Sequence, residues 1–376
     1  MAHETRTHAV LSASASKRWL SCPPSAKLNA ELPDTTSEYA REGTCAHELA
    51  EYKVNKVLGV EAEDLAENVG FDDSEMEDCT DSYAQYISEQ MSQYATPVVM
   101  VEQRLDFSKY VPGGFGTGDC IIVADDVLTV IDFKYGKGVA VDAEGNPQMM
   151  LYALGALEMF CVLYDIGEIK MVIFQPRIEN ISESVITVSD LLDWAENELK
   201  LKAELAAKGK GEFCAGEHCR FCKVKATCRK RAEYNLAIAQ YDFAPPDMLE
   251  DNEIEMILER ADALVSWAAD VKEYALSQAL SGKQWNGYKV VEGKSNRRYT
   301  DEKLVAEAVK AAGKNPYSEP EVLGITAMTK LLGGKKKFDE LLSKYVCKPQ
   351  GKPTLVPMSD KRKTWKNTAN EDFQED

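Results

Sequence analysis

Residues 116–134, GTGDCIIVADDVLTVIDFK, constrain the fold more than any other stretch, because they predict a β-hairpin that carries charged side chains. Two apolar runs, 120–124 and 127–131, are rich in Ile and Val and are typical of strands. Asp125 and Asp126 lie between them and suit a two-residue turn. The segment therefore predicts two antiparallel strands in direct succession.

The register of this hairpin predicts a charged cluster. Pairing of Ala124 with Val127 sets Asp119 opposite Asp132, and opposed residues share a sheet face with Cβ atoms about 5 Å apart. Lys134 is two residues past Asp132 and lies on the same face. Two adjacent carboxylates repel each other unless a cation lies between them, and hard divalent ions such as Mg²⁺ take oxygen ligands. The cluster indicates metal-assisted hydrolysis of a phosphodiester, with a hairpin bearing solvated charges as the alternative.

Two flanking segments predict helices with polar faces. Thr44 is expected to cap a helix that runs to about residue 58, which places His47 in its first turn. Downstream, Asn146 and the proline after it form a helix start. Gln148 and Tyr152 then follow at i and i+4 and share one face of that helix.

Four short motifs in the hairpin and the two flanking helices, taken in this order, resemble the PD-(D/E)XK nuclease superfamily in its RecB-like branch, over about residues 14–230. The matching motifs are GxxxH at Gly43–His47, GxxD at Gly116–Asp119, DxK at Asp132–Lys134 and QxxxY at Gln148–Tyr152. The resemblance implies an α/β fold with a mixed central sheet flanked by helices, a restriction-endonuclease-like core.

The resemblance also implies roles for individual residues. Metal ligands for Mg²⁺ or Mn²⁺ would be His47, Asp119, Asp132 and the carbonyl of Phe133. Lys134 would position the attacking water. Gln148 and Tyr152 would support the site and touch the substrate backbone. The branch sometimes uses an auxiliary carboxylate. Glu102, at the end of a predicted strand, is the candidate for that role.

A set of cysteines forms a second pattern. Cys219, Cys222 and Cys228 have the spacing C-x₂-C-x₅-C, and Cys22 stands nearly two hundred residues earlier in RWLSCPP. AddB-type nucleases and CRISPR-adaptation nucleases of the same branch have this layout around a [4Fe–4S] cluster, which needs thiolate ligands. Such a cluster would clasp the N-terminal segment to the end of the nuclease core.

A local zinc site is the rival interpretation of this pattern. Cys214 also precedes the three clustered cysteines, and His218 lies among them. Four sulphurs at short spacing describe structural zinc as well. The cluster interpretation depends on Cys22 as the fourth ligand, whereas the zinc interpretation depends on Cys214.

Charge is distributed unevenly along a chain whose net charge is −18. Residues 61–81 hold ten acids and no base, and such a segment would repel a phosphate backbone. Residues 330–366 hold eleven Lys/Arg against three Asp/Glu. A basic patch of this kind can contact DNA, with Lys335, Lys336 and Lys337 as candidates, or can be a solvated tail.

Composition predicts a cytoplasmic protein with no membrane segment. The start of the chain lacks the apolar core of a signal peptide, and the longest apolar stretch, 149–164, is interrupted by Glu158. Ten cysteines, four of them in ligand-like spacing, suit a reducing compartment.

Two domains are expected. Residues 1–230 form the nuclease core with the cysteine clasp, and residues 231–376 form an accessory region with a long helix at 254–280, a strand pair at 287–299 and the basic tail. The expected function is a metal-dependent DNA exonuclease of phage-type recombination or repair, working beside a single-strand annealing protein in a bacterial host. An RNA substrate stays open. A non-catalytic DNA-binding or scaffold protein that keeps the metal clasp is the alternative.

Overall fold

The computed structural model describes residues 9–33, 38–60, 74–237, 249–291, 329 and 334–342. The chain divides into two compact units, Met1–Gln278 and Ala279–Asp376. The predicted division between residues 230 and 231 falls inside the first unit, and as a boundary between functions it stays a prediction.

A five-stranded mixed sheet forms the centre of the first unit, with the strands in the order β1-β2-β3-β4-β5. Neighbouring strands are antiparallel except β3 and β4, which are parallel and are joined by a helical crossover. The strands are β1 Val98–Asp106, β2 Phe115–Ala124, β3 Val127–Phe133, β4 Glu168–Gln175 and β5 Asn180–Thr187. The predicted mixed α/β architecture is confirmed.

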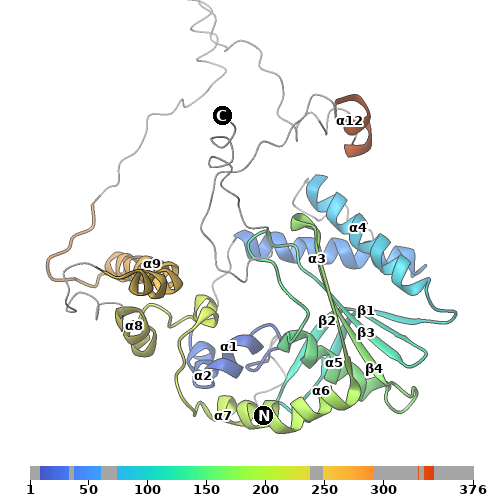
Figure 1. Ribbon diagram of the computed structural model, residues 1–376, viewed down its shortest axis with the longest axis horizontal. Coiled ribbons are helices and arrows are strands. Elements are labelled where there is room, and N and C mark those ends of the chain that lie inside the picture. Colours follow the sequence, from blue (N-terminus) through green and yellow to red (C-terminus); the bar gives the residue numbers. More distant parts are fainter. Residues whose placement is uncertain are drawn as a thin grey trace, which may run out of the picture. The chain divides into compact units, whose positions relative to one another are not determined.

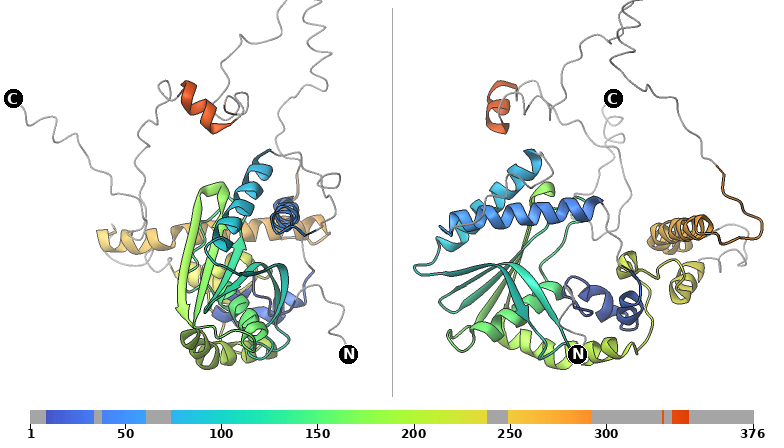
Figure 2. Two further views of the ribbon diagram at one scale, coloured as in Figure 1. Left: turned by 90° about the vertical axis from the view of Figure 1, so that its right-hand side faces the viewer. Right: turned by 180° about the vertical axis from the view of Figure 1, so that it is seen from behind.

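Helices cover both faces of this sheet (Figures 1 and 2). One face carries α3 Glu38–Val57 and α4 Ser74–Met91. The other carries α5 Pro147–Phe160 and a continuous helical run made of α6 Val188–Trp194, the π-helical turn η3 Ala195–Leu199 and α7 Lys200–Lys208. Short helices complete the unit: α1 Ser16–Ser21, α2 Ser25–Ala30, η2 Pro176–Ile178, η4 Glu217–Phe221 and α8 Arg229–Leu236.

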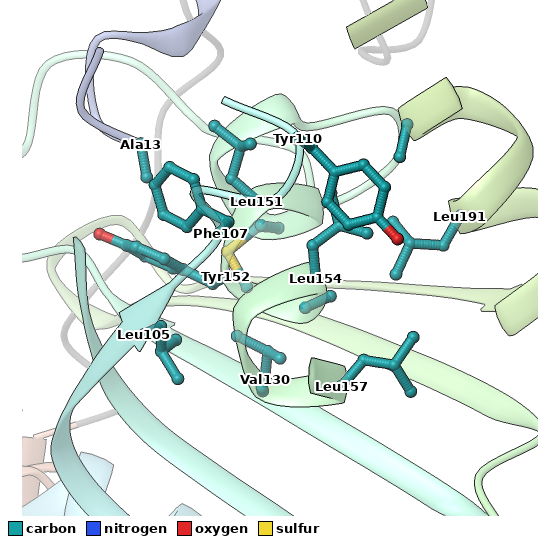
Figure 3. Packing of buried hydrophobic residues seen from close by; sticks show 14 of the residues in the cluster. Ala13, Leu105, Phe107, Tyr110, Val130, Leu151, Tyr152, Leu154, Leu157 and Leu191 are labelled. Atoms are coloured by element: carbon teal, nitrogen blue, oxygen red, sulfur yellow. The ribbon is translucent and has the colours of Figure 1, made fainter. Parts of the chain in front are cut away.

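The apolar helix α5 packs its length against the sheet (Figure 3). Asn146 caps it by accepting from the backbone N–H groups of Gln148 and Met149, as its sequence predicts. A Cβ placed on Gly155 would come within 2.8 Å of Leu105, and one on Gly116 within 2.8 Å of Tyr152. Glycine therefore lets α5 approach β1 and β2 closely, which brings the start of α5 to the ends of the strands.

The helix that carries His47 begins earlier than Thr44 predicts. α3 starts at Glu38, and Thr44 lies inside it, where its hydroxyl donates to the Ala40 carbonyl 3.0 Å away. The predicted cap at Thr44 is therefore wrong. Residues 38–42 contain good helix formers and no breaker, so the backbone continues through Thr44, whose hydroxyl turns back to the preceding turn instead.

Regular structure described after residue 250 is helical, comprising α9 Asp251–Leu280 and α12 Lys335–Leu342. The predicted long helix is confirmed. The predicted strand pair is wrong for residues 287–291, which are irregular, and its remainder lies outside the described residues. Within the described chain, no helix has the length and apolar character needed to cross a membrane.

Candidate metal centre and active site

The hairpin adopts the register that its sequence predicts. Ala124 pairs with Val127, and the ladder continues to Cys120 opposite Ile131, so the next position sets Asp119 opposite Asp132. The turn residue Asp125 has a φ of +52°, in the left-handed region that such a turn requires. The ladder ends at the two aspartates, which frees their carboxylates for other contacts.

Asp119 bridges the hairpin to helix α3. Its Oδ2 accepts a hydrogen bond of 2.6 Å from the backbone N–H of Phe133, and its Oδ1 lies 3.5 Å from Nδ1 of His47. The His47 ring also meets the Phe133 ring edge-on, with 5.4 Å between centroids. The contact shown for Phe133 is thus its N–H, and the predicted role of its carbonyl as a ligand stays a prediction.

Glu102 reaches this cluster through an irregularity in β1. Its φ of +48° lies in the left-handed region, which costs a non-glycine residue about 1–2 kcal/mol. The register is unchanged across it and places Glu102 opposite Asp119. Val101 packs with the α3–α4 side of the sheet, whereas Leu105 packs with the α5 side. Both would share one face of a regular strand, so the alternation of side chains inverts between them.

His47, Glu102 and Asp119 together form a candidate metal site. One ligand atom from each lies within 4.8 Å of the others. An imidazole nitrogen and two carboxylates are a donor set that suits Mn²⁺ or Mg²⁺. Burial, and next the nearby Asp119, raise the pKa of Glu102 to about 7. Two carboxylates forced together in this way fit a bound divalent cation, which would relieve their repulsion.

This raised pKa predicts how the metal-free protein responds to pH. The Glu102 carboxyl has a pKa of about 7 in the folded state against an ordinary glutamate pKa of 4.5, so it keeps its proton to higher pH when folded. Its contribution to the stability of the folded state therefore falls as the pH rises from about 4.5 to 7, and stays low above that range. Glu102→Gln should consequently raise the melting temperature at pH 8 without divalent ions, and the gain should shrink at pH 5.

Thermal melts at the two pH values check this expectation, with Glu51→Gln, a neighbouring carboxylate on α3, as the matched control. Added Mn²⁺ should reverse the order at pH 8, because Glu102→Gln removes a metal ligand. An equal gain at pH 5 and pH 8 would contradict the assignment of the effect to this carboxyl.

The second half of the site surrounds Asp132. Its Oδ1 accepts from the side-chain amide of Gln148 at 3.0 Å, and its Oδ2 lies 2.8 Å from the ammonium of Lys134. That Oδ2 accepts no well-directed hydrogen bond from the described residues. The Gln148 amide also lies 3.3 Å from the Tyr152 hydroxyl, and its oxygen 3.4 Å from the Lys134 ammonium. The structure thus brings together Asp132, Lys134, Gln148 and Tyr152, as the motifs predict.

Electrostatics separate the two aspartates. Burial acts to raise the pKa of both carboxyls, but for Asp119 the combined effect of His47, Lys134 and the Phe133 N–H outweighs burial, and the pKa falls below its usual value. For Asp132 burial prevails over Lys134, and the pKa is raised. Burial lowers the pKa of Lys134, but Asp132 and Asp119 outweigh it and raise that pKa above the usual value. Lys134 is therefore an ammonium at neutral pH and donates hydrogen bonds rather than accepting protons.

Arg177 holds the supporting elements together. Its guanidinium lies 2.9 Å from Glu42 on α3 and 2.9 Å from Glu75 on α4, and it stacks 4.3 Å over the ring of Tyr135. Tyr135 follows Lys134 directly, and Glu42 lies just over one turn before His47. Arg177 therefore connects the helix that carries His47 to the strand end that carries Lys134.

We expect Arg177→Ala to weaken Mn²⁺ binding by about tenfold or more, because residues that orient ligands typically carry effects of this size. Isothermal titration with Mn²⁺ measures the effect. Lys53→Ala is the matched control, since Lys53 ties α3 to α4 through Glu77 and Asp81 without contacting the strand ends. Equal losses of stability in both variants with unchanged Mn²⁺ affinity would show that Arg177 is merely structural.

A buried glutamine shapes the loop between Lys134 and α5. The Gln175 amide donates to the carbonyls of Gly136 and Val139, and its oxygen accepts from the N–H of Val141 and from Asn180. All polar atoms of this side chain are used. Gln175 thereby sets the path that connects the Lys134 strand to the helix of Gln148.

The cysteine pattern joins the N-terminal segment to the end of the core. Cys22, Cys219 and Cys222 are buried and Cys228 is half-buried, whereas Cys214 is exposed. The Asn29 amide donates to Sγ of Cys222 at 3.3 Å. Burial lowers the pKa of Arg18, and the charges of Cys222 and Cys22 act against that fall.

The basic tail is described only in part. Lys335, Lys336 and Lys337 are exposed at the start of α12, and the remainder of residues 330–366 lies outside the described residues apart from 334 and 338–342. Their predicted contact with DNA stays a prediction.

Comparison with known proteins assigns the chain to a family. The family model described as "Protein of unknown function (DUF2800)" matches residues 8–363. The chain belongs to the DUF2800 family. The DUF2800 chain is also similar to the solved structure titled "Crystal structure of SSO0001", with 14% sequence identity over 48% of this chain and 94% of that one. The TM-score of 0.22 is too low for that likeness to support an argument.

The sequence motifs identify only part of this site. The family resemblance names Glu102 as an auxiliary carboxylate, but nothing local in the sequence signals its left-handed φ. Arg177 and Gln175 follow an apolar strand and carry no motif. Gln175 could have been noticed as a polar residue that ends the run IKMVIF.

Proposed function

We propose that this protein is a metal-dependent nuclease of the PD-(D/E)XK type that hydrolyses phosphodiester bonds of DNA. The observation that carries the proposal is the metal-ligand triad of His47, Glu102 and Asp119 beside the ion pair of Asp132 and Lys134. A triad alone would suit a structural ion. A lysine held next to it by a buried carboxylate supplies what hydrolysis needs in addition, a cation that orients a reacting water.

Each residue has a distinct task in this proposal. His47, Glu102 and Asp119 would hold Mg²⁺ or Mn²⁺. Asp132 would be a further ligand of the ion while it keeps its ion pair with Lys134. A bound divalent ion lowers the pKa of water and polarises the phosphate. Lys134 stays protonated and donates a hydrogen bond to the attacking water or to the charge that develops on phosphate. Gln148 orients Asp132 and the Tyr152 hydroxyl through one amide group.

The buried cysteines support a [4Fe–4S] cluster held by Cys22, Cys219, Cys222 and Cys228. The zinc alternative requires Cys214, which is exposed. His218, its further candidate ligand, already has its Nε2 2.9 Å from the Cys214 carbonyl. Burial of Cys22 together with Cys219 and Cys222, against the exposure of Cys214, favours the set that includes Cys22. The cluster has a structural role in this proposal, because four protein thiolates leave it no open position.

The broader assignment rests on the sequence resemblance. It proposes an exonuclease that acts on linear DNA during phage-type recombination, in the cytoplasm of a bacterial host and beside a single-strand annealing protein. The basic residues Lys335, Lys336 and Lys337 are proposed to guide the DNA.

Digestion of end-labelled linear DNA tests the nuclease proposal. We expect the native protein to degrade linear DNA when Mg²⁺ or Mn²⁺ is added, and a covalently closed circle to survive. Asp132→Asn preserves the shape and the hydrogen bond from Gln148 but removes the charge, so it should lose cleavage while keeping the melting temperature within a few degrees. Metal-independent cleavage, or equal cleavage by Asp132→Asn, would refute the proposal.

A further inference from the structure

The segment around the clustered cysteines is strongly basic in an acidic chain. Residues 218–231 contain six Lys/Arg and no Asp/Glu, although the whole chain has a net charge of −18. In the structure this segment comprises most of η4, the turns that follow it and the first turn of α8 (Figure 1). A local excess of cations in such a chain needs a reason, and the structure shows which of these cations are used internally.

Three of the six cations have structural partners. Lys225 and Arg231 both pair with Asp270 on α9, at 2.8 and 2.6 Å. The ammonium of Lys223 donates to the backbone carbonyls of Asn29 and Leu32. These contacts anchor the segment to α2 and α9, so it is held in place by its own side chains.

The other three cations are exposed. Arg220, Arg229 and Lys230 have no ion pair within the described part of the chain. Arg220 lies on η4, and Arg229 and Lys230 begin α8. In the turns up to α8, the N–H groups of Cys219, Cys222, Lys225 and Cys228 each bond to a carbonyl three or four residues earlier, so the exposed cations are carried on ordered backbone.

An aromatic side chain is exposed next to one of these cations and in the same segment as the other two. Phe221 has 77% of its surface exposed, although the cysteines on either side of its turn, Cys219 and Cys222, are buried. The Arg220 guanidinium lies 5.8 Å from the centre of the Phe221 ring. The phenyl ring is thus presented to solvent by a turn whose neighbouring residues are anchored, and its exposure costs hydrophobic free energy in the free protein.

We propose that Arg220, Phe221, Arg229 and Lys230 form a contact surface for single-stranded nucleic acid. Exposed aromatic rings stack on bases, and neighbouring cations neutralise the phosphates of the same strand. A duplex hides its base faces and would use only the cations. This inference deepens the proposed function, because it names a substrate strand and a surface that meets it outside the metal site.

Binding without cleavage tests this surface. The native full-length protein is titrated against a fluorescent oligo(dT) with no divalent ion added, and anisotropy is recorded at several salt concentrations. Phe221→Ala should weaken binding about fivefold or more, since one stacked base contributes about 1–3 kcal/mol. Phe221→Trp should retain the affinity. Leu201→Ala is the matched control, because Leu201 is a 65% exposed apolar residue on α7 and should have no effect.

Salt dependence tests the cations separately. Replacing Arg220, Arg229 and Lys230 with alanine should reduce the log–log salt slope by about 2, at about 0.7 for each phosphate contact on a single strand. Lys202→Ala, which removes a half-exposed lysine of α7 paired with Glu198 of η3, should leave the slope unchanged.

Several outcomes would overturn this inference. If Phe221→Ala bound oligo(dT) as tightly as Leu201→Ala, the ring would not stack on a base. This conclusion would hold even if the variant without the three cations lost binding. A duplex that binds as tightly as oligo(dT) and responds equally to Phe221→Ala would also show that the ring does not stack. Since the assay needs no cleavage, oligo(dT) binding through Phe221 in a protein that degrades no DNA would refute the nuclease and leave this surface standing.

Discussion

Asp119→Ala should abolish both Mn²⁺ binding at the triad and metal-dependent cleavage of linear DNA. Asp119 supplies a carboxylate to the triad, contacts His47, and accepts the Phe133 N–H. Lys134→Ala should behave differently, because Lys134 is no metal ligand. It should bind Mn²⁺ but cleave about 10²–10³-fold more slowly, the usual effect of removing one donor to developing charge. Calorimetric Mn²⁺ titration and single-turnover cleavage measure the two effects.

Asp119→Asn controls for folding in this comparison. Asp119→Ala leaves the N–H of Phe133 without its acceptor, which costs about 1–3 kcal/mol of stability. The amide oxygen of asparagine can still accept that hydrogen bond, so Asp119→Asn should melt close to the native protein and still fail to bind Mn²⁺. Cleavage by Asp119→Asn at the native rate would remove Asp119 from the metal site.

The cysteine clasp should dominate the stability of the first unit. Cys222→Ala is expected to cost about 4 kcal/mol or more, because a link from Cys22 to the end of the core closes a very long loop of the unfolded chain. Purified native protein should be brown and contain iron, and Cys222→Ala should be colourless, should melt at a lower temperature and should be cut faster by proteases.

Cys214→Ala separates the two cofactor interpretations. The cluster assignment predicts native colour, iron content and stability for this variant, because exposed Cys214 is not a ligand. Colourless native protein that contains zinc and is destabilised by Cys214→Ala rather than by Cys22→Ala would instead establish the local zinc site.

Local patterns predicted the β2–β3 hairpin and half of the site. Apolar runs rich in Ile and Val and a two-residue turn sufficed for the β2–β3 register, since neighbouring strands in a hairpin depend on few distant contacts. The same register set Asp119 opposite Asp132, with Lys134 two residues further along. The apolar run after Asn146 likewise defined α5, and with it Gln148 and Tyr152.

Helix ends were less predictable. Thr44 has the side chain of a good cap, yet α3 begins six residues earlier at Glu38. A cap residue is favourable only where the helix has another reason to start, and here Glu42 in the earlier turn forms an ion pair with Arg177. That pair involves residues more than a hundred positions apart, which no local pattern contains.

By itself, the sequence determined which strands pair as a hairpin, which helix follows it, and which charged residues face each other across the turn. The resemblance suggested Glu102 as an auxiliary carboxylate, but only the tertiary structure placed it beside His47 and Asp119 in the candidate metal site. A glutamate with a φ of +48° is unfavourable in an isolated strand, and it persists here because β2 on one side and α3 above hold the backbone in place. The same holds for Arg177 and Gln175, whose partners come together only when both faces of the sheet are covered.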